Sequence, residues 1–491
     1  MLNNSTSNIS FKPAAESLEF LSSENTRYTY ANLYGFTFQL LQSIDNYTFT
    51  ASSPLLIHTA TSEKKVFLLS AAFLLKIPVM VLHHDTTEQE LENILQKISA
   101  NVIYSDFDYS SEKLRNLYQI DIPDDYLIEK ESWREDLFSL SDPTSVAGLF
   151  LTSGSTSSPK IVPVKRRQVF VAANSSAQNF KPGKNKYWLL CLPLNHVGGI
   201  NVIYRSILYQ SAIYLTHSFD EVKIRELLYS NKNFEVASMV PTMLEQLMED
   251  RFFRVHFGFK AILLGGGPIT IQFIDKAITR GLPIVSSYGM TETCAQIAAN
   301  PLLQPSGAYI PKTSIGKPFS PNKVEIRDEN GKNVSVNESG QIWLKGPQVF
   351  DGYLDENLNK NAFDDDGWFN TGDFGHLNRK GHIFIETRRT DLIITGGENV
   401  APVDVENVLN SSKHVKESGV IGVPDKKWGQ KVVAYFVPSS NSFDIDELKL
   451  ELKSMLKGFQ IPKEFIPIAK LPKTETFKIQ RQKLIDRYQN R

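Results

Sequence analysis

One short segment combines hydroxyl groups, a glycine and a lysine in an order suited to binding phosphate. After an apolar run, the chain reads Thr152-Ser153-Gly154-Ser155-Thr156-Ser157-Ser158-Pro159-Lys160. Hydroxyls, backbone N–H groups and one compact ammonium give a polyphosphate many donors with little bulk. The segment is not a Walker loop, because the chain contains no GxxxxGK[ST] pattern. Taken alone, these residues are equally compatible with a solvated serine-rich turn.

Two glycine-containing segments follow strand-like runs further along the chain. They read Gly265-Gly266-Gly267-Pro268 and Ser287-Tyr288-Gly289-Met290-Thr291-Glu292-Thr293. Glycine lets the backbone pass close to a ligand, and a carboxylate such as Glu292 is a hard oxygen ligand suited to magnesium on phosphate. Open α/β sheets bind ligands at the carboxyl ends of their strands, so both segments predict parts of a nucleotide site. By themselves, the three glycines are equally typical of a sharp turn.

Three more segments with charged residues lie in the C-terminal part of the chain, and each alone is typical of a solvated surface. They are 368–373 (WFNTGD), 388–399 (RRTDLIITGGEN) and 472–481 (PKTETFKIQR). Together with the earlier segments, their order and spacing resemble the adenylate-forming superfamily. That superfamily contains acyl- and aryl-CoA ligases, firefly-type luciferases and peptide-synthetase adenylation domains. The resemblance spans about residues 146–482.

The resemblance implies an α/β fold with a large N-terminal domain of two βαβ-type sheets plus a small β-barrel, followed by a small α+β C-terminal lid. The expected boundaries are 1–387 for the N-terminal body, 388–392 for a hinge and 393–491 for the lid. It also implies an enzyme that uses ATP, Mg²⁺ and coenzyme A, with a nucleotide site between the two domains.

Nucleotide-binding roles follow from the resemblance residue by residue. The loop on the ATP β- and γ-phosphates would comprise Thr152, Ser153, Gly154, Ser155, Thr156 and Lys160. Adenine would be framed by Gly265, Gly266, Gly267, Pro268 and Tyr288, and Gly289 would be a further cofactor-binding residue. Thr291 would bind the α-phosphate and Glu292 the magnesium ion. Asp373, assisted by Arg388, would accept hydrogen bonds from both ribose hydroxyls, as an ionised carboxylate does well.

The lid would contribute a catalytic lysine and a glycine pair. Lys478 matches the lysine that bridges the substrate carboxylate and the α-phosphate during adenylation, where its charge would offset developing negative charge. Gly396 and Gly397 match the loop that lines the pantetheine tunnel. The sequence departs from the family pattern at four positions, which puts loop flexibility and lid kinetics in doubt more than the reaction: Ser157, Ile161, Thr390 and Phe477.

The acid substrate is indicated by the segment LPLNHVGGI at 192–200, with Arg205 nine residues after His196. This pattern, with GMTETCAQ at 289–296 and WGQ at 428–430, resembles the o-succinylbenzoate–CoA ligases of menaquinone biosynthesis. His196 would then stand beside the acyl pocket as a catalytic and substrate-binding residue. The acid has two carboxylates; one is activated, and the planar fork of Arg205 suits the other.

A purely structural role is the alternative interpretation for both His196 and Arg205. His196 would also fit as a core-facing histidine that packs and hydrogen-bonds without touching substrate. Arg205 would also fit as a solvated surface arginine. Another aryl- or acyl-CoA ligase, a carrier-loading adenylation enzyme, or a catalytically silent nucleotide-binding relative remain alternatives. Retention of the charged residues argues against silence: Lys160, Glu292, Asp373, Arg388 and Lys478.

Composition excludes several other classes. The chain's 53 basic and 54 acidic residues leave a formal net charge of −1, so no broad nucleic-acid-binding or anionic-membrane surface is expected. The longest apolar stretch, 66–75, is too short to cross a bilayer. Cys191 and Cys294 are most simply small buried hydrophobes, which suits a reducing, cytoplasmic location. The expected partners are an aromatic carboxylic acid, ATP and CoA, with homodimer formation left open.

The elements that must position these residues are visible as alternating patterns. At about 150 residues per domain, 491 residues predict about three units. Strand-like runs alternate with helical segments through the first 290 residues, which predicts parallel sheets covered by helices on both faces. The predicted strands are 55–58, 78–82, 101–105, 187–192, 211–215, 234–239, 260–264 and 283–287. After about residue 312, short β pieces between Asn, Gly and Asp turns predict a small antiparallel sheet or barrel.

Overall fold

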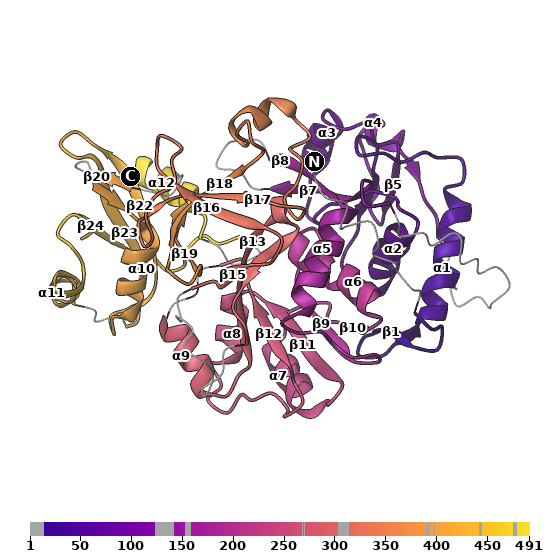
Figure 1. Cartoon of the computed structure of the whole chain (residues 1–491), viewed down its shortest axis with the longest axis horizontal. Helices are drawn as coiled ribbons and strands as arrows, with labels where there is room; N and C mark the ends of the chain where they lie inside the picture. Colours follow the sequence, from indigo (N-terminus) through magenta and orange to yellow (C-terminus); the bar gives the residue numbers. More distant parts are fainter. Residues whose placement is uncertain are drawn as a thin grey trace.

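A computed structural model describes residues 14–122, 142–152, 159–267, 269, 271–302, 314–388, 393–395, 398–440, 444–474 and 479–491. Within these residues the strands form four sheets, arranged as a large body and a smaller C-terminal unit (Figure 1). The predicted α/β class is confirmed. None of the described helices combines the length and the apolar character that a bilayer span requires.

The first sheet contains the two strands that flank the predicted phosphate loop in sequence. Its order is β6-β5-β3-β4-β7-β8, parallel except for the β7–β8 hairpin. Its strands are β3 (Leu55–His58), β4 (Val79–Val81), β5 (Val102–Ser105), β6 (Tyr118–Gln119), β7 (Val146–Thr152) and β8 (Lys160–Lys165). The connecting helices are α2 (Glu63–Leu74), α3 (Glu88–Leu95) and α4 (Glu112–Arg115). Helix α3 begins in a capping box, in which Thr87 and Glu90 satisfy each other's free N–H groups.

The second sheet is the largest of the described part, with the order β15-β14-β13-β12-β11-β9-β10-β1-β2. Its strands are β1 (Glu19–Ser22), β2 (Arg27–Thr29), β9 (Tyr187–Leu190), β10 (Ala212–Leu215), β11 (Phe234–Met239), β12 (Ala261–Leu264), β13 (Ile284–Met290), β14 (Ala295–Ala299) and β15 (Lys317–Pro318). The six central strands are parallel. The accompanying helices are α1 (Tyr30–Ser43), α5 (Arg166–Ala177), α6 (Val197–Tyr209), α7 (Glu221–Ser230), α8 (Pro241–Leu247) and α9 (Ile271–Thr279).

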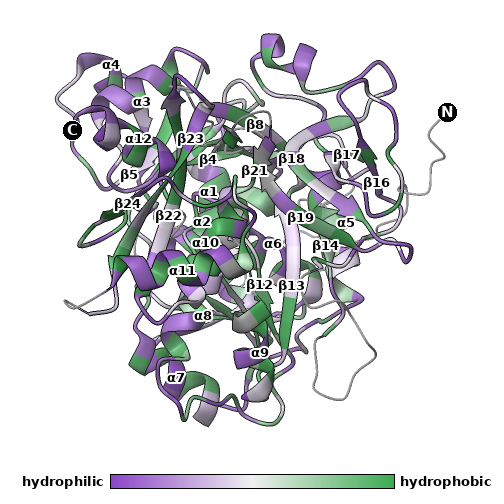
Figure 2. Ribbon diagram, turned by 90° about the vertical axis from the view of Figure 1, so that its left-hand side faces the viewer, coloured by the Kyte–Doolittle hydropathy of each residue, from purple (hydrophilic) through white to green (hydrophobic). Residues whose placement is uncertain are grey.

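The two sheets share a central layer of helices. Helices α2, α5 and α6 lie between them and contribute to one continuous apolar core (Figure 1). Helices α7, α8 and α9 cover the other face of the large sheet, and α3 and α4 cover the outer face of the small one. Figure 2 shows the apolar residues on the strands and the inner helices, and hydrophilic residues over much of α3 and α7. This burial on both faces explains why the strands read as continuous apolar runs.

The region expected to form a small barrel is an antiparallel four-stranded sheet in the order β16-β17-β18-β19. Its strands are β16 (Lys323–Arg327), β17 (Gly340–Lys345), β18 (Phe369–Leu377) and β19 (Ile383–Arg388). In the part of the chain that the structure describes, the two outer strands do not pair with each other, so this sheet is open. A short 3₁₀ helix, η3 (Glu356–Asn361), lies between β17 and β18.

The C-terminal unit is a five-stranded sheet with helices on both faces. Its strands are β20 (Ile393–Thr395), β21 (Glu398–Val400), β22 (Val415–Asp425), β23 (Gly429–Pro438) and β24 (Glu464–Pro467). Helices α10 (Pro402–Ser411) and α11 (Ile445–Met455) pack on one face, and α12 (Arg481–Gln489) packs on the other. The Arg481 guanidinium forms two hydrogen bonds, of 2.7 and 2.8 Å, to the buried Glu406 carboxylate and so ties α12 to α10.

Candidate functional site

The glycine-rich turn follows β12 at the carboxyl end of the large parallel sheet. Gly266 has a φ of +79°, a backbone conformation that favours glycine. The turn lies beside β13, because Ser287 Oγ donates a hydrogen bond to the Leu264 carbonyl at 2.8 Å. Pro268 lies outside the described residues. The two segments predicted to frame adenine therefore run side by side.

Tyr288 and Gly289 lie at the end of β13, where the parallel sheet meets the antiparallel strand β14. A Cβ atom on Gly289 would lie 1.7 Å from the Ala295 carbonyl oxygen, so only glycine fits this approach. The Tyr288 hydroxyl donates a hydrogen bond to Asp373 Oδ2 at 2.6 Å. Asp373, on β18, is only 3% exposed. The structure thus joins the tyrosine predicted beside adenine to the carboxylate predicted to bind ribose, although 85 residues separate them.

The 3₁₀ turn η2 (Thr291–Thr293) follows directly and presents Glu292. The Thr293 hydroxyl accepts a hydrogen bond from the Met290 N–H at 3.0 Å, and this bond fixes the turn. Glu292 is 9% exposed, and its Oε1 accepts a hydrogen bond from the Tyr353 hydroxyl at 2.9 Å. Its carbonyl oxygen accepts the Phe350 N–H at 2.8 Å. The backbone and the carboxylate of Glu292 are therefore held by the same segment of chain.

The charge of Glu292 fits a cation. Of the lysines, arginines and histidines that the structure describes, none forms an ion pair with this buried carboxylate. A buried charge that lacks a partner in the protein is costly and is suited to a bound ion. Magnesium typically takes one or two protein carboxylates together with phosphate oxygens and water. A single buried carboxylate without an ion-pair partner among the described residues agrees with that mode of binding.

The ends of the predicted phosphate loop are fixed by the β7–β8 hairpin, in which Thr152 pairs with Lys160. The Lys160 ammonium lies 4.8 Å from the centre of the Tyr353 ring, close enough for a cation–π contact. Ser153, Gly154, Ser155, Thr156 and Ser157 lie outside the described residues. Ile161, one of the four departures, is buried, and its carbonyl accepts the Leu354 N–H at 3.0 Å.

Arg388 ends β19, where its backbone pairs with Asp373 on β18. The sheet therefore brings together the two residues predicted to bind ribose. Lys478, Gly396, Gly397, Thr390 and Phe477 lie outside the described residues. A β-bridge between Lys473 and Ile479 joins the chain on either side of the Lys478 segment.

The two residues proposed for the acid lie on one helix but in different surroundings. His196 is the half-buried N-cap residue of α6. Arg205 lies inside the same helix and is 2% exposed, so it is not a surface arginine. Its Nη1 donates to Ser176 Oγ at 3.3 Å and to Gln296 Oε1 at 3.2 Å. Its Nε and Nη2 have no hydrogen-bond partner in the described chain.

Of the two cysteines predicted to be buried, Cys294 is buried and Cys191 is half-buried. Burial raises the pKa of the Cys191 thiol to about 12 and that of the Cys294 thiol to about 11. Both thiols therefore stay protonated near neutral pH. The Cys294 sulfur lies 3.5 Å from Asn201 Nδ2 on α6. In this position Cys294 serves packing between η2 and α6.

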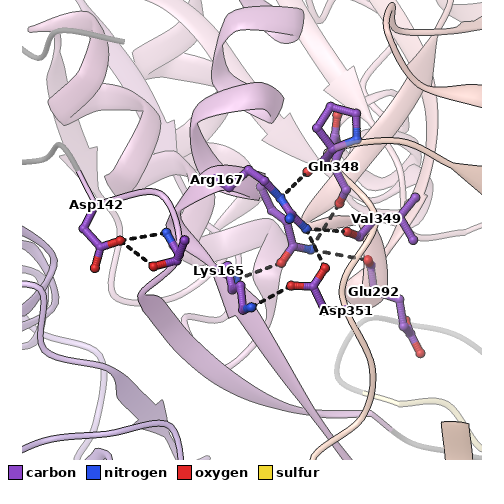
Figure 3. A network of polar contacts seen from close by, with 10 residues as sticks. Asp142, Lys165, Arg167, Glu292, Gln348, Val349 and Asp351 are labelled. Carbon is purple, nitrogen blue, oxygen red and sulfur yellow. Dashed lines mark hydrogen bonds and ion pairs between the residues drawn. The ribbon is translucent and has the colours of Figure 1, made fainter. Parts of the chain in front are cut away.

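Sequence reasoning missed the partners of Glu292. Tyr353 is 61 residues from Glu292, and no spacing rule links the two. The only local signal is the dipeptide Gly352-Tyr353 between two polar turns, which is too common to indicate a role. Asp351 and Arg167, which hold the same segment in place, carry no distinguishing pattern either (Figure 3).

Comparison with known proteins agrees with this geometry. The model of the AMP-binding enzyme family matches residues 9–354, and that of the AMP-binding enzyme C-terminal domain matches residues 404–478. The chain belongs to the AMP-binding enzyme family.

Within that family the chain is similar to 2-succinylbenzoate–CoA ligases. It is 39% identical to the one from Listeria monocytogenes over 362 residues, which cover 74% of each chain. A solved structure of o-succinylbenzoate CoA synthetase from Bacillus subtilis, in complex with the acyl-adenylate intermediate OSB-AMP, superposes with a TM-score of 0.85 at 29% identity. That match covers 97% of this chain and 98% of the other. The Bacillus subtilis enzyme in complex with ATP and magnesium ion superposes with a TM-score of 0.83 at 30% identity, covering 95% and 96%.

Proposed function

We propose that this protein is an ATP-dependent, AMP-forming ligase that joins 2-succinylbenzoate (o-succinylbenzoate) to coenzyme A in menaquinone biosynthesis. Similarity to 2-succinylbenzoate–CoA ligases over most of the chain supports the substrate. The structural observation that carries the proposal is the pair of buried carboxylates, Glu292 and Asp373, each of which accepts a hydrogen bond from a tyrosine hydroxyl. This pair suits a magnesium–phosphate group and a ribose respectively.

The reaction proceeds in two steps without a protein nucleophile. A carboxylate oxygen of the acid attacks the α-phosphorus of ATP, the bond to the β-phosphate oxygen breaks, and pyrophosphate leaves. The thiol sulfur of CoA then attacks the carbonyl carbon of the acyl-adenylate, AMP leaves with the bonding electrons, and the thiol proton is released. Forming the mixed anhydride first supplies a good leaving group before the thiol arrives.

The chain's own residues position the nucleotide for the first step. Asp373 and Arg388 orient the ribose, while Tyr288 and the 265–268 turn frame the base. Lys160 and the residues of the 152–156 loop hold the terminal phosphates, and Thr291 binds the α-phosphate. A magnesium ion at Glu292 would neutralise phosphate charge and orient the phosphate chain. Lys478 would offset the negative charge that builds on the α-phosphate oxygens during attack.

The residues assigned to the acid are His196 and Arg205. His196 stands at the start of α6, and a helix side chain such as that of Arg205 tilts toward this N-terminal end. The buried guanidinium of Arg205 forms no ion pair with a carboxylate in the described chain, and burial lowers its pKa. The second carboxylate of the substrate would supply the missing counter-charge. Gly396 and Gly397 would line the path of the CoA pantetheine arm.

A panel of acids tests the proposed function. AMP release is measured with ATP and Mg²⁺, with and without CoA, for 2-succinylbenzoate, benzoate and a fatty acid. We expect turnover on 2-succinylbenzoate to exceed that on the other acids and to require CoA for sustained cycles. Strong turnover on benzoate or the fatty acid alone would assign another acyl-CoA ligase, and no AMP release with any acid would assign a silent relative.

We also propose that the protein is cytoplasmic and forms a homodimer. A monomer mass measured by light scattering would reject the dimer.

A further inference from the structure

The segment between β17 and η3 passes directly over the turn that presents Glu292 (Figure 3). The Phe350 N–H donates to the Glu292 carbonyl at 2.8 Å, and Gln168 Nε2 donates to the same oxygen at 3.4 Å. Gln348 Nε2 also donates to the Thr293 carbonyl at 2.9 Å. The position of the Glu292 backbone is thus set by residues that no nucleotide motif contains.

Tyr353, at the end of this segment, fixes the carboxylate itself. Its hydroxyl donates to Glu292 Oε1 at 2.9 Å, and none of the described residues donates to Oε2. In this hydrogen bond the phenol O–H is the donor and the carboxylate oxygen is the acceptor. One carboxylate oxygen is occupied and its partner is left for another ligand.

The ring of the same tyrosine contacts the phosphate-loop lysine. The Lys160 ammonium lies 4.8 Å from the ring centre and forms a cation–π contact with the ring. The hydroxyl of the same tyrosine donates a hydrogen bond to Glu292. Lys160 and Glu292 are 132 residues apart in sequence, and Tyr353 contacts both. A single side chain thereby sets the spacing between a cation and an anion of the site.

An ion-pair clamp holds the segment on the start of α5. Asp351 Oδ2 lies 2.6 Å from Lys165 Nζ, and Asp351 Oδ1 lies 2.9 Å from Arg167 Nη2. Arg167 also donates from Nε to the Pro347 carbonyl at 2.9 Å and from Nη2 to the Val349 carbonyl at 3.1 Å. Figure 3 shows these contacts converging on the segment from one side. The clamp restrains the chain just before Tyr353.

We propose that Tyr353 is a positioning residue for nucleotide binding, whose hydroxyl orients Glu292 toward a divalent cation and whose ring orients Lys160 toward the terminal phosphates. The inference rests on the proposed role of Glu292 as the magnesium ligand. It adds two separable functions on one side chain, because the hydroxyl and the ring can be removed one at a time.

Two substitutions separate these functions. Tyr353→Phe keeps the ring, so ATP affinity without metal should match wild type within about twofold. Its Mg²⁺-dependent gain in ATP affinity should fall roughly tenfold, as expected for loss of a hydrogen bond to a charged group. Tyr353→Leu also removes the ring, so ATP affinity in EDTA should fall a further ~3-fold or more. ATP binding is measured by calorimetry in EDTA and across a Mg²⁺ titration, with no acid present.

A matched control is Tyr34→Phe, which also removes the hydroxyl of a buried tyrosine. The Tyr34 hydroxyl donates to the backbone carbonyl of Ala14 at 2.9 Å and not to a predicted site residue. It should cost similar stability in thermal unfolding and leave both binding constants unchanged. Superposable Mg²⁺ titrations of wild type and Tyr353→Phe, or an equal shift in Tyr34→Phe, would overturn the inference. Binding needs no acid substrate, so a wrong assignment of the acid would leave this result intact, whereas absence of any Mg²⁺ effect on wild type would reject the role of Glu292.

Discussion

The nucleotide end and the acid end of the body are built differently. The predicted nucleotide residues stand on strands β13 and β18 and in the turns beside them, where Tyr288 donates a hydrogen bond to Asp373 and Tyr353 donates one to Glu292. The residues proposed for the acid lie on one helix, and Arg205 is buried in its interior with neutral partners. Turns in a nucleotide site restrict the residue types at particular positions, and these restrictions appear in the sequence as short motifs. The sequence pattern of an acid site made of helix and core residues resembles that of ordinary core packing.

This difference predicts how substitutions will behave at each end. Loss of a nucleotide residue should change ATP kinetics more than it changes stability, because these polar side chains stand in strands and turns beside the site and contribute little apolar packing. Loss of an acid residue inside α6 should change stability and acid kinetics together, because burial couples the two. The predictions below run from the largest expected effect to the smallest.

Lys478→Ala should abolish most adenylate formation, by about 10²–10³-fold, since the role proposed for this lysine is to offset the negative charge that develops in the transition state. Conversion of supplied acyl-adenylate and CoA to thioester should remain within a few-fold of wild type. Pyrophosphate release and thioester formation are measured separately. Lys483→Ala on the adjacent helix α12 is the control and should change neither. Equal loss in both half-reactions would count against the role of Lys478.

Asp373→Asn should raise the KM for ATP roughly tenfold or more and leave the KM for the acid nearly unchanged, because a neutral amide accepts ribose hydrogen bonds less strongly than a carboxylate. Steady-state kinetics with each substrate varied in turn provide the readout. Asp366→Asn, in the exposed turn before the same sheet strand, should behave as wild type. A KM for ATP that stays at the wild-type value would reject Asp373 as a ribose ligand.

Arg205→Ala should raise the KM for 2-succinylbenzoate at least about tenfold while the KM for ATP changes less than about twofold, as expected for removal of a charged carboxylate partner. The chain offers a close control in Arg166, a fully buried arginine on α5 whose Nη1 donates to the Phe73 carbonyl at 2.5 Å. Arg166→Ala should lower the unfolding temperature similarly without altering the acid KM. If both variants leave that KM unchanged, Arg205 is a core residue and the acid end lies elsewhere.

Asp351→Asn should produce the smallest effect, seen as reduced stability rather than lost chemistry. Burial alone would raise the pKa of Asp351, but hydrogen bonds from Lys165 and then Arg167 outweigh it and hold that pKa below the ordinary value. A lowered pKa contributes stability that is present above the ordinary value of ~3.9 and is lost as the pH falls through the folded value. Urea unfolding of wild type and Asp351→Asn should therefore differ at pH 6 and converge in acid. A constant difference down to about pH 3 would contradict the ion-pair account.

The sequence predicted much of this architecture because the relevant signals are local. The apolar run 55–58 coincides with β3, and 234–239 coincides with β11. The order in which the strands pair was not predictable, because neighbouring strands can be far apart in sequence. β1 pairs with β10, for example, although almost 200 residues separate them. The open sheet β16–β19 shows the same limit, since closure depends on pairing of its outer strands rather than on local pattern.

The candidate site divides along the same line. Gly289 and Glu292 could be predicted as site residues, because a close backbone approach and the proposed metal ligand both restrict the residue type within a short motif. Tyr353 could not be predicted, because its contacts with Glu292 and Lys160 form only when η2, β8 and the segment after β17 are brought together. Arg205 was proposed from the resemblance of its segment to o-succinylbenzoate–CoA ligases, and its burial was not predictable, since isolated charges in a helical pattern usually face solvent.

The most direct test of the central proposal is the stoichiometry of products formed from 2-succinylbenzoate, MgATP and CoA. The account predicts one CoA thioester and one AMP for each pyrophosphate released, with no thioester when CoA or ATP is omitted. AMP formed without thioester in the presence of CoA, or thioester formed equally well from benzoate, would contradict it.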